Sequence, residues 1–395
     1  MAKKILLLLE VLFFTLTISA GACNKNLTLK KGQGVREQLK RENTTYIILY
    51  DFDLNGETIK IPRNCCLHFE GGKFLNGSII GDRTKVKSEA KRIFERIALT
   101  GSWDNREVYS EWFDFVEGKE IDNGQNFINM MTSCVSEKMT HLYMQAGNFY
   151  CSAIAESSNI RIPSNVYWHN SATIIQLSTS CTKYGFVLLQ NSQNVIIEGG
   201  EFVGDVKNHI GNDGEWGHGI KVAGAKNILL KNIIVREFWG DGIDLIEALD
   251  SKGKPTIDCE NVTISGVKCD ANRRQGLSIE SGKRIVITDS EFINTGKYGR
   301  TAPGSGIDIE PWNDDSDKIQ NIKISRCKLL NNWGYDLQLY ANFKKMNPEV
   351  LDNKIKISDC VIGKSYAYKT KGVTFRRCQM NMQLKKKDSF NILIR

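Results

Sequence analysis

Acidic side chains recur at alternate positions of short aliphatic segments in the second half of the chain. These residues are Asp241, Asp244, Glu280, Asp308 and Glu310. Alternate residues of a strand share one face, and strands otherwise disfavour Asp. Pairs of carboxyl groups are the side chains that hydrolyse glycosidic bonds. The five acids are therefore the candidate catalytic residues.

The register of these segments predicts the spacing between the acids. Neighbouring parallel strands lie ~4.8 Å apart. Asp244 and Asp308 are expected two strands apart with Ser278 between them, close to the roughly 6.5–9.5 Å separation of inverting glycosidases. Glu280 and Glu310 are expected on adjacent strands. They could share a proton, which would raise the pKa of one carboxyl into the range of a general acid.

Other residues of the same segments are candidates for substrate binding. Arg274 is expected to hold a carboxylate or sulfate of the substrate. Aromatic side chains are expected to stack against sugar rings: Tyr335, Tyr340 and Trp312, with Trp239 near the same groove. The remaining candidates are His218, Lys221 and Gln275. A structural role for His218 and a surface ion pair for Lys221 stay open, and loops 246–260, 295–305 and 340–353 are expected beside this face.

These segments belong to an internal repeat. The phrase Asn-aliphatic-x-aliphatic, or a close variant of it, starts at residues 194, 227, 261, 284, 321, 354 and 372. Its period of two predicts a strand, and the unequal intervals predict coils of constant section joined by loops of different length. In this register Cys327, Cys360 and Cys378 share one column and are expected to be small apolar core residues, not disulfides. The phrase-initial column of Asn194, Asn227, Asn261 and Asn321 is expected to form a ladder of amides.

A second phrase, x-Gly-aliphatic-x-aliphatic, precedes the first in each coil. It starts at residues 218, 241, 275, 305 and 335, with Asp336 replacing the glycine in the last copy. Its aliphatic residues are expected to point inward and its x positions outward on one sheet. The two phrases together predict an all-β fold, a right-handed single-stranded parallel β-helix in which the five acids gather on one outer sheet.

The entry to this solenoid resembles that of a known superfamily. Glu111-Trp112-Phe113, Asp122–Ile128 and Gly147–Tyr150 are similar to the entry segment of pectin-lyase-like proteins, in which a short N-terminal helix caps the first coil. Residues 101–380 resemble that superfamily of carbohydrate-active β-helices, especially its polygalacturonase-like branch. The resemblance implies an exported bacterial protein that acts on polysaccharide. Because the scaffold hosts hydrolases, lyases, epimerases and non-enzymes, the resemblance implies the fold more than the reaction.

The motifs of polygalacturonases map only in part. Their adjacent Asp-Asp pair falls near Gly240–Asp244, where the acids are separated. Their Gly-His-Gly corresponds in letters to Gly217–Gly219, but here it precedes the acidic coil instead of following it. An Arg-Ile-Lys is missing from the expected place. We therefore do not expect a polygalacturonase in the strict sense.

The N-terminus has the pattern of an export signal. Residues 1–22 have a basic start, an apolar stretch and a small-residue processing site. Cys23 follows at once, as in bacterial lipoproteins, so we expect Cys23 to be lipidated. The protein is then expected on the outer membrane, on the cell surface or in the periplasm, with plain secretion as the alternative.

Residues 23–100 are expected to form a β-rich segment and residues 101–395 the β-helix. The formal net charge of +8 favours anionic partners.

Three functions remain open from the sequence. The first is a glycoside hydrolase that uses the five acids on a polysaccharide or oligosaccharide. The second is a polysaccharide lyase with Arg274 or Lys221 as the base, in which Asp308 and Glu310 could bind Ca²⁺. The third is a non-catalytic carbohydrate-binding surface protein. We expect no other cofactor or metal site, no nucleic-acid partner, and membrane contact only through a lipid at Cys23.

Overall fold

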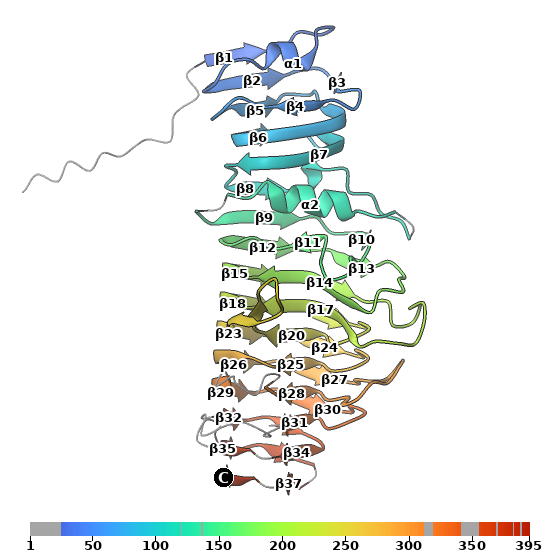
Figure 1. The fold of residues 1–395 in the computed structure, drawn as a ribbon, viewed down its shortest axis with the longest axis vertical. Helices are drawn as coiled ribbons and strands as arrows, with labels where there is room; N and C mark the ends of the chain where they lie inside the picture. The colour runs from blue at the N-terminus through green and yellow to red at the C-terminus, as the bar shows by residue number, and fades with distance from the viewer. Residues whose placement is uncertain are drawn as a thin grey trace, which may run out of the picture.

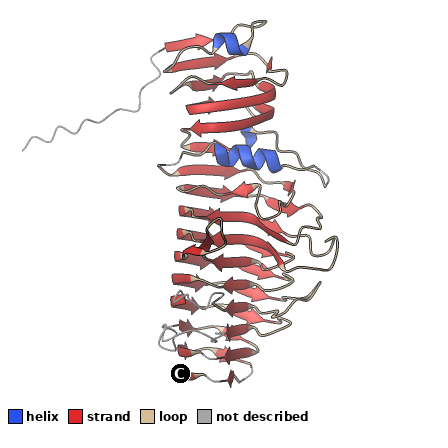
Figure 2. Cartoon of the chain, in the orientation of Figure 1, coloured by secondary structure: helices blue, strands red, loops and turns tan. Residues whose placement is uncertain are grey.

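The computed structural model describes residues 25–119, 121–135, 137–311, 319–340, 355–368, 370–381, 383–387 and 389–395. The chain winds into a rod of stacked strands, with β1 (Lys25–Thr28) near one end and the C-terminus at the other (Figure 1). Strands dominate the described residues, and the α-helices among them are short: Val35–Gln38 (α1) and Gly124–Thr132 (α2) (Figure 2). The predicted all-β parallel β-helix is confirmed. Cys23 and the predicted signal peptide lie outside the described residues.

Each full coil supplies one strand to each of three parallel sheets. Sheet 1 contains β8 (Glu107–Tyr109), β9 (Thr140–Met144), β12 (Val166–Asn170), β15 (Gln193–Glu198), β18 (Lys226–Lys231), β23 (Glu260–Ser265), β26 (Gly282–Thr288), β29 (Ile319–Ser325), β32 (Ile355–Ser358), β35 (Lys371–Arg376) and β38 (Phe390–Ile394). Sheet 2 contains β10 (Asn148–Cys151), β13 (Thr173–Gln176), β16 (Glu201–Val203), β19 (Ile234–Arg236), β24 (Lys268–Asp270), β27 (Glu291–Ile293), β30 (Lys328–Leu330), β33 (Val361–Ile362) and β36 (Gln379–Met380). Sheet 3 contains β11 (Ile160–Arg161), β14 (Lys183–Gln190), β17 (Trp216–Ala223), β20 (Ile243–Ile246), β25 (Leu277–Ile279), β28 (Ile307–Ile309), β31 (Leu337–Tyr340), β34 (Ser365–Tyr368) and β37 (Lys385–Lys387). The first phrase of the repeat thus builds sheets 1 and 2, and the second phrase builds sheet 3.

The N-terminal part of the rod is also made of parallel strands. Besides β1 they are β2 (Thr44–Ile48), β3 (Phe52–Asp53), β4 (Thr58–Lys60), β5 (Cys66–Phe69), β6 (Phe74–Ser88) and β7 (Phe94–Trp103). The stretch expected to be β-rich, residues 23–100, is therefore mostly strands and turns from Lys25 on, with the short helix α1 among them. A short 3-10 helix (Ser110–Trp112) and α2 lie between β8 and β9, the first two strands of sheet 1.

Helix α2 is the capping helix that the sequence predicts. Its Phe127 and Met130 are fully buried. The Asn129 side chain accepts a hydrogen bond from the backbone N–H of Leu99 and donates one to the carbonyl of Ile97, both in β7. Because β1–β7 continue the rod beyond it, α2 lies within the rod and covers the core of the first full coil there.

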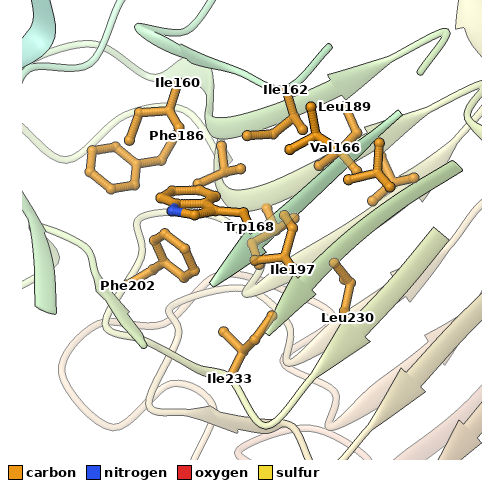
Figure 3. Close-up of a cluster of buried hydrophobic side chains, with 14 of the residues drawn as sticks. Ile160, Ile162, Val166, Trp168, Phe186, Leu189, Ile197, Phe202, Leu230 and Ile233 are labelled. Atoms are coloured by element: carbon orange, nitrogen blue, oxygen red, sulfur yellow. The ribbon is translucent and has the colours of Figure 1, made fainter. Parts of the chain in front are cut away.

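The interior is a continuous column of apolar side chains. Alternating residues of sheet 1 point inward, as Val166 and Trp168 do in β12, and both are fully buried. Trp168 meets Phe202 of sheet 2 edge to face, with 5.7 Å between the ring centroids, and aliphatic side chains from neighbouring coils surround the pair (Figure 3). The period-two pattern of the sequence is therefore the pattern of burial.

The predicted cysteine and asparagine ladders both form. Cys327 and Cys360 are buried, free thiols, and the backbone N–H of Cys327 lies 3.4 Å from the Cys360 sulfur. Asn227 Nδ2 donates to Asn194 Oδ1 (3.0 Å) and Asn261 Nδ2 donates to Asn227 Oδ1 (2.9 Å). Arg284 takes the position in the next coil and donates to Asn261 Oδ1 over 2.6 Å, so the asparagines are not continuous up to Asn321. These asparagines have φ near 57°, a left-handed conformation that Asn tolerates better than most residues.

The asparagine ladder makes a testable contribution to stability. Asn227→Ala removes two amide hydrogen bonds and places Ala in the left-handed region, so we expect the free energy of unfolding to fall by roughly 2 kcal/mol. Asn227→Gly removes the same bonds without the backbone strain, so the expected loss is about 1 kcal/mol. Equilibrium unfolding in urea measures both. Equal losses in the two variants would contradict the role given to the backbone conformation.

Candidate functional site

The strand register of sheet 3 brings the predicted acids together. Lys221, Asp244, Ser278, Asp308 and Gln338 pair in sequence along β17, β20, β25, β28 and β31. Asp244 and Asp308 are thus two strands apart, as the sequence predicts. Ile279 pairs with Ile309, so the residues that follow them, Glu280 and Glu310, are on adjacent strands. We call Asp241, Asp244, Glu280, Asp308 and Glu310 the acid cluster.

Most of the acid cluster lies below the surface. The exposed fractions of Asp241, Asp244 and Asp308 are 0%, 1% and 1%, whereas Glu280 and Glu310 are partly exposed. The sequence predicted side chains on an outward-facing groove. The register is as predicted, but the three aspartates are covered. Burial of this many carboxyls opposes ionisation, so it governs the chemistry of the cluster.

Asp241 is held by three side chains. Its Oδ2 accepts hydrogen bonds from Arg274 Nη1 (2.8 Å) and Ser278 Oγ (2.7 Å), and His218 Nδ1 lies 3.4 Å from it. Burial raises the pKa of Asp241 to about 7, with Asp244 adding to the rise and Arg274 opposing it. Asp241 therefore exchanges a proton near neutral pH.

Asp244 lies between the side chains of Lys221 and His218. Its Oδ2 is 3.7 Å from Lys221 Nζ and 3.7 Å from His218 Nε2. The His218 Nδ1 accepts a hydrogen bond from the backbone N–H of Asp241, which places the ring proton on Nε2, toward Asp244. Burial, together with Lys221 and Arg274, holds the pKa of His218 well below its usual range. Burial also raises the pKa of Asp244, while Lys221 and Arg274 oppose the rise.

The remaining acids of the cluster, Glu280, Asp308 and Glu310, also have raised pKa values. Burial and then the charge of Glu310 raise the pKa of Asp308 well above its usual value. Burial raises the pKa of Glu310 as well, while Arg274 and Asp308 oppose the rise. Burial and the charge of Asp244 raise the pKa of Glu280 well above its usual value. Neighbouring carboxyls that are shielded from water do not readily ionise together, so Asp308 and Glu310 are the candidate proton-donating pair.

Within the acid cluster, three buried carboxylate oxygens lack a hydrogen-bond partner among the described residues. They are the Oδ1 atoms of Asp241, Asp244 and Asp308. Buried polar atoms in folded proteins are nearly always paired, so an unpaired one marks a place for water or a ligand. Three such atoms in stacked coils indicate a site built to receive polar groups.

Arg274 is the central cation of the site. Besides bonding to Asp241, its Nε lies 3.8 Å from Glu215 Oε2. Burial disfavours its charge, but Asp241, Glu280 and Glu215 outweigh burial and raise its pKa. Sequence reasoning missed Glu215, which comes from a loop outside the repeat. It also missed Gln338 as a site residue, although its place in the second phrase was a usable signal. Gln338 Nε2 donates to Asp308 Oδ2 over 3.2 Å.

The predicted substrate-binding residues lie in different environments. Lys221 is accessible and borders a groove of about 170 Å³ that Lys183, Gln190 and Glu247 also line. His218 and Gln275 are buried, at 2% and 1% exposure, so they face protein instead of solvent. Tyr335 and Tyr340 are partly exposed and stack on Tyr366 and Tyr368 of the next coil. Trp312 lies outside the described residues.

Trp239, which the sequence placed near the same groove, is enclosed by other parts of the chain. Its ring stacks on His209 with 3.7 Å between centroids, and the Arg273 guanidinium lies 3.8 Å from its centroid. It is 5% exposed. Loop 204–216 explains this burial, because Arg273 also donates hydrogen bonds to the Asn212 and Gly214 carbonyls of the loop. The same loop carries Glu215, so Trp239 and Arg273 position a residue of the site.

The predicted loops include one regular element. Residues 246–260, expected as a long loop, contain an antiparallel hairpin of β21 (Ala248–Leu249) and β22 (Pro255–Ile257). The Cys259 thiol after it lies within hydrogen-bonding distance of the Val222 carbonyl of sheet 3. The hairpin therefore returns to the edge of the site next to Lys221 and Glu247.

Neither a metal centre nor a membrane span is found in the described ranges. No group of three or more His, Cys, Asp or Glu side chains there is arranged to hold a metal ion. None of the helices in those ranges is long and apolar enough to cross a membrane. The calcium-dependent alternative remains a prediction from the spacing of Asp308 and Glu310.

Known proteins share this architecture. Residues 179–314, which hold most of the site, match the family model described as right handed beta helix region. The SPbeta prophage-derived uncharacterized protein YorA of Bacillus subtilis (strain 168) is 28% identical over 188 residues, 44% of this chain. The chain spans about a third, 32%, of the length of that relative.

Solved structures are similar at low sequence identity. The tailspike protein gp49 of Acinetobacter baumannii bacteriophage Fri1, a capsular polysaccharide depolymerase, superposes with a TM-score of 0.43 at 13% identity, covering 73% of this chain and 57% of that one. The polygalacturonase of Erwinia carotovora ssp. carotovora superposes with a TM-score of 0.36 at 9% identity, covering 95% of each chain. With its three parallel sheets and the matched family model, this chain has a right-handed parallel β-helix fold, as the sequence predicts.

Proposed function

We propose that the protein cleaves the glycosidic bonds of an acidic polysaccharide by acid–base hydrolysis at the acid cluster. The observation that carries this proposal is the set of buried, unpaired Oδ1 atoms of Asp241, Asp244 and Asp308. Hydrolysis needs one carboxyl that donates a proton and another that activates water or attacks the sugar. The cluster has carboxyls of both kinds. Asp241 and Asp244 lie beside the cations Arg274 and Lys221, whereas Asp308 lies beside another carboxyl, that of Glu310.

The proton donor in this proposal is the Asp308–Glu310 pair. Burial raises the pKa of both carboxyls, and the charge of Glu310 raises that of Asp308 further, so the pair holds a proton. Glu310 is the partly exposed member, so it is the one that reaches the leaving-group oxygen. Gln338 holds the Asp308 carboxyl from the other side.

The base in this proposal is Asp244, supported by Asp241. Lys221 and the Nε2–H of His218 stabilise the anion of Asp244, and Arg274 with Ser278 does the same for Asp241. Asp244 and Asp308 are two strands apart, with β25 between them. Their backbones are therefore ~10 Å apart before the side chains lean toward each other. That spacing leaves room for a water molecule at the unpaired oxygens and favours inversion over retention.

The charges around the cluster favour an acidic substrate. Lys221 and Lys183 line the adjoining groove, where they would attract carboxylate or sulfate groups. Arg274 is a poor base for a lyase reaction, because its ion pair with Asp241 keeps it protonated. Export and a lipid anchor at Cys23 remain proposals that rest on residues 1–23 alone.

Incubation with a panel of acidic and neutral polysaccharides tests this proposal. The expected products are new reducing ends without the ultraviolet absorbance of an unsaturated sugar. Unsaturated ends would instead indicate a lyase. Binding without turnover across the panel would leave a non-catalytic carbohydrate-binding protein.

The pH dependence of turnover provides a second test. The protonated Asp308–Glu310 pair is the active form, so kcat should fall as the pH rises through the raised pKa of the pair. Glu310→Gln removes the shared proton. We expect it to lower kcat by roughly 10²-fold or more and to abolish this alkaline limb. The control is Glu291→Gln in sheet 2, which should keep the wild-type profile. A Glu310→Gln variant with an unchanged pH profile would contradict the assignment.

A further inference from the structure

A second groove lies on a different sheet from the acid cluster. It has a volume of about 660 Å³ and is formed by β6, β8, the start of β9, Trp112, and residues 104–106, 135 and 137–139. This places it over sheet 1, where the N-terminal strands meet the first full coils (Figure 1). Residues of the acid cluster do not line it. We call it the junction groove.

The lining of the junction groove is basic. Its cations outnumber its acids, which are Asp104, Glu107 and Glu137. The cations are Arg83, Lys85, Lys87, Arg106 and Lys138. Lys85 pairs with Asp104 at 3.4 Å. The other four have no ion pair with a described carboxylate, and all four are exposed. Their charges are therefore available to an anionic ligand.

Aromatic rings form one wall of the same groove. Tyr109, Trp112 and His141 line it. Tyr109 and Trp112 meet edge to face with 5.5 Å between centroids. The Tyr109 ring also stacks on Tyr143 at 5.1 Å, and Tyr143 stacks on His169 at 4.7 Å. These are outward-facing, partly exposed residues of β8, β9 and β12, so the aromatic wall continues along sheet 1 beyond the groove.

We propose that the junction groove binds a segment of an acidic polysaccharide at a site separate from the acid cluster. Sugars present apolar C–H faces that pack against aromatic rings and hydroxyls that remain in water, and aromatic side chains suit such half-wet contacts. Arg106 and Lys138 are positioned to bind carboxylate or sulfate groups along the chain. The combination of aromatic wall and unpaired cations favours an acidic glycan over a neutral one.

A second basic groove provides the matched comparison. It has a volume of about 730 Å³, lies over β29, β32 and β35 toward the C-terminal end of sheet 1, and is lined by Lys323, Lys356 and several arginines. Aromatic side chains are missing from its lining. Its described lining is more basic than that of the junction groove, because it contains no acidic side chain. It lacks the stacking surface, so charge reversal there controls for general electrostatic attraction.

Affinity gel electrophoresis with polygalacturonate in the gel tests the proposal, with dextran as the neutral polymer. All proteins carry Asp308→Asn to prevent cleavage of the polymer. Arg106→Glu/Lys138→Glu should weaken binding to polygalacturonate by roughly tenfold or more, since two charge-assisted contacts are lost. Lys323→Glu/Lys356→Glu, the control pair, should change it little. Tyr109→Ala, which leaves the net charge unchanged, should also weaken binding, with near-wild-type circular dichroism as the check on folding.

The possible results separate this site from the alternatives. Equal weakening by the two charge-reversal pairs would overturn the proposal, as would equal binding of dextran and polygalacturonate. Absence of binding by the parent protein would overturn it too. Binding to phosphatidylglycerol vesicles that needs Arg106 and Lys138, without polygalacturonate binding, would assign the groove to a lipid surface instead. Because binding is measured without turnover, failure of the proposed hydrolysis would not alter these results.

Discussion

Replacing Asp308 by Asn is expected to lower the rate of polysaccharide hydrolysis by roughly 10²–10⁴-fold. The amide has nearly the shape of the carboxyl but cannot share a proton with Glu310. Asp308 is 1% exposed and accepts a hydrogen bond from Gln338, so a variant of the same size should keep the fold. The release of reducing ends at substrate saturation measures the effect.

The control for this variant is Asp270→Asn. Asp270 is a partly exposed residue of sheet 2 that pairs with Lys268 at 3.1 Å. It undergoes the same chemical change away from sheet 3, and we expect wild-type activity. Full activity of Asp308→Asn, with an unfolding curve like that of the wild type, would show that the acid cluster does not carry the reaction.

Replacing Arg274 by Met is expected to destabilise the protein most at alkaline pH. The change leaves the carboxylate of Asp241, at 0% exposure, without its cation. Removing one partner of a buried ion pair costs about 3–5 kcal/mol. Equilibrium unfolding in urea at pH 8 should show a loss of this size. Arg236→Met, which breaks a more exposed pair with Glu201, should cost ~1 kcal/mol or less.

The pH dependence of this loss follows from Asp241. Burial raises its folded-state pKa from 3.8 to about 7, so the folded protein binds this proton more tightly than the unfolded chain. The stability that comes from it is fully present below pH 3.8 and is lost as the pH rises through about 7. Without Arg274 the pKa of Asp241 should rise further, and near pH 5 the protonated Asp241 needs no cation. The stability loss should therefore be smaller at pH 5 than at pH 8, and a loss independent of pH would contradict this account.

The repeat made the register of the fold predictable. Only one alignment of the Asn-aliphatic-x-aliphatic phrase keeps the apolar residues inside, because a slip by one residue would expose all of them. That register alone places Asp244, Ser278 and Asp308 in one row, and it puts Cys327 and Cys360 in the core. Repetition thus supplied the long-range information that a single sequence usually lacks.

The non-repeating parts were not predictable in the same way. Loop 204–216 has no counterpart in other coils, so nothing in the sequence indicated that Glu215 would reach Arg274 or that Trp239 would be enclosed by His209 and Arg273. Burial of the acids was missed for a related reason. The period of two distinguishes inward from outward side chains, but it does not report what covers an outward one.

Hydrolysis in water enriched in ¹⁸O tests the central claim most directly. If the acid cluster activates water against the glycosidic bond, each product with a new reducing end carries one oxygen from the solvent, and mass spectrometry shows the corresponding increase. The products of Asp308→Asn should be scarce under the same conditions. Dehydrated, unsaturated products without solvent oxygen, or no cleavage of any acidic polysaccharide, would contradict the account.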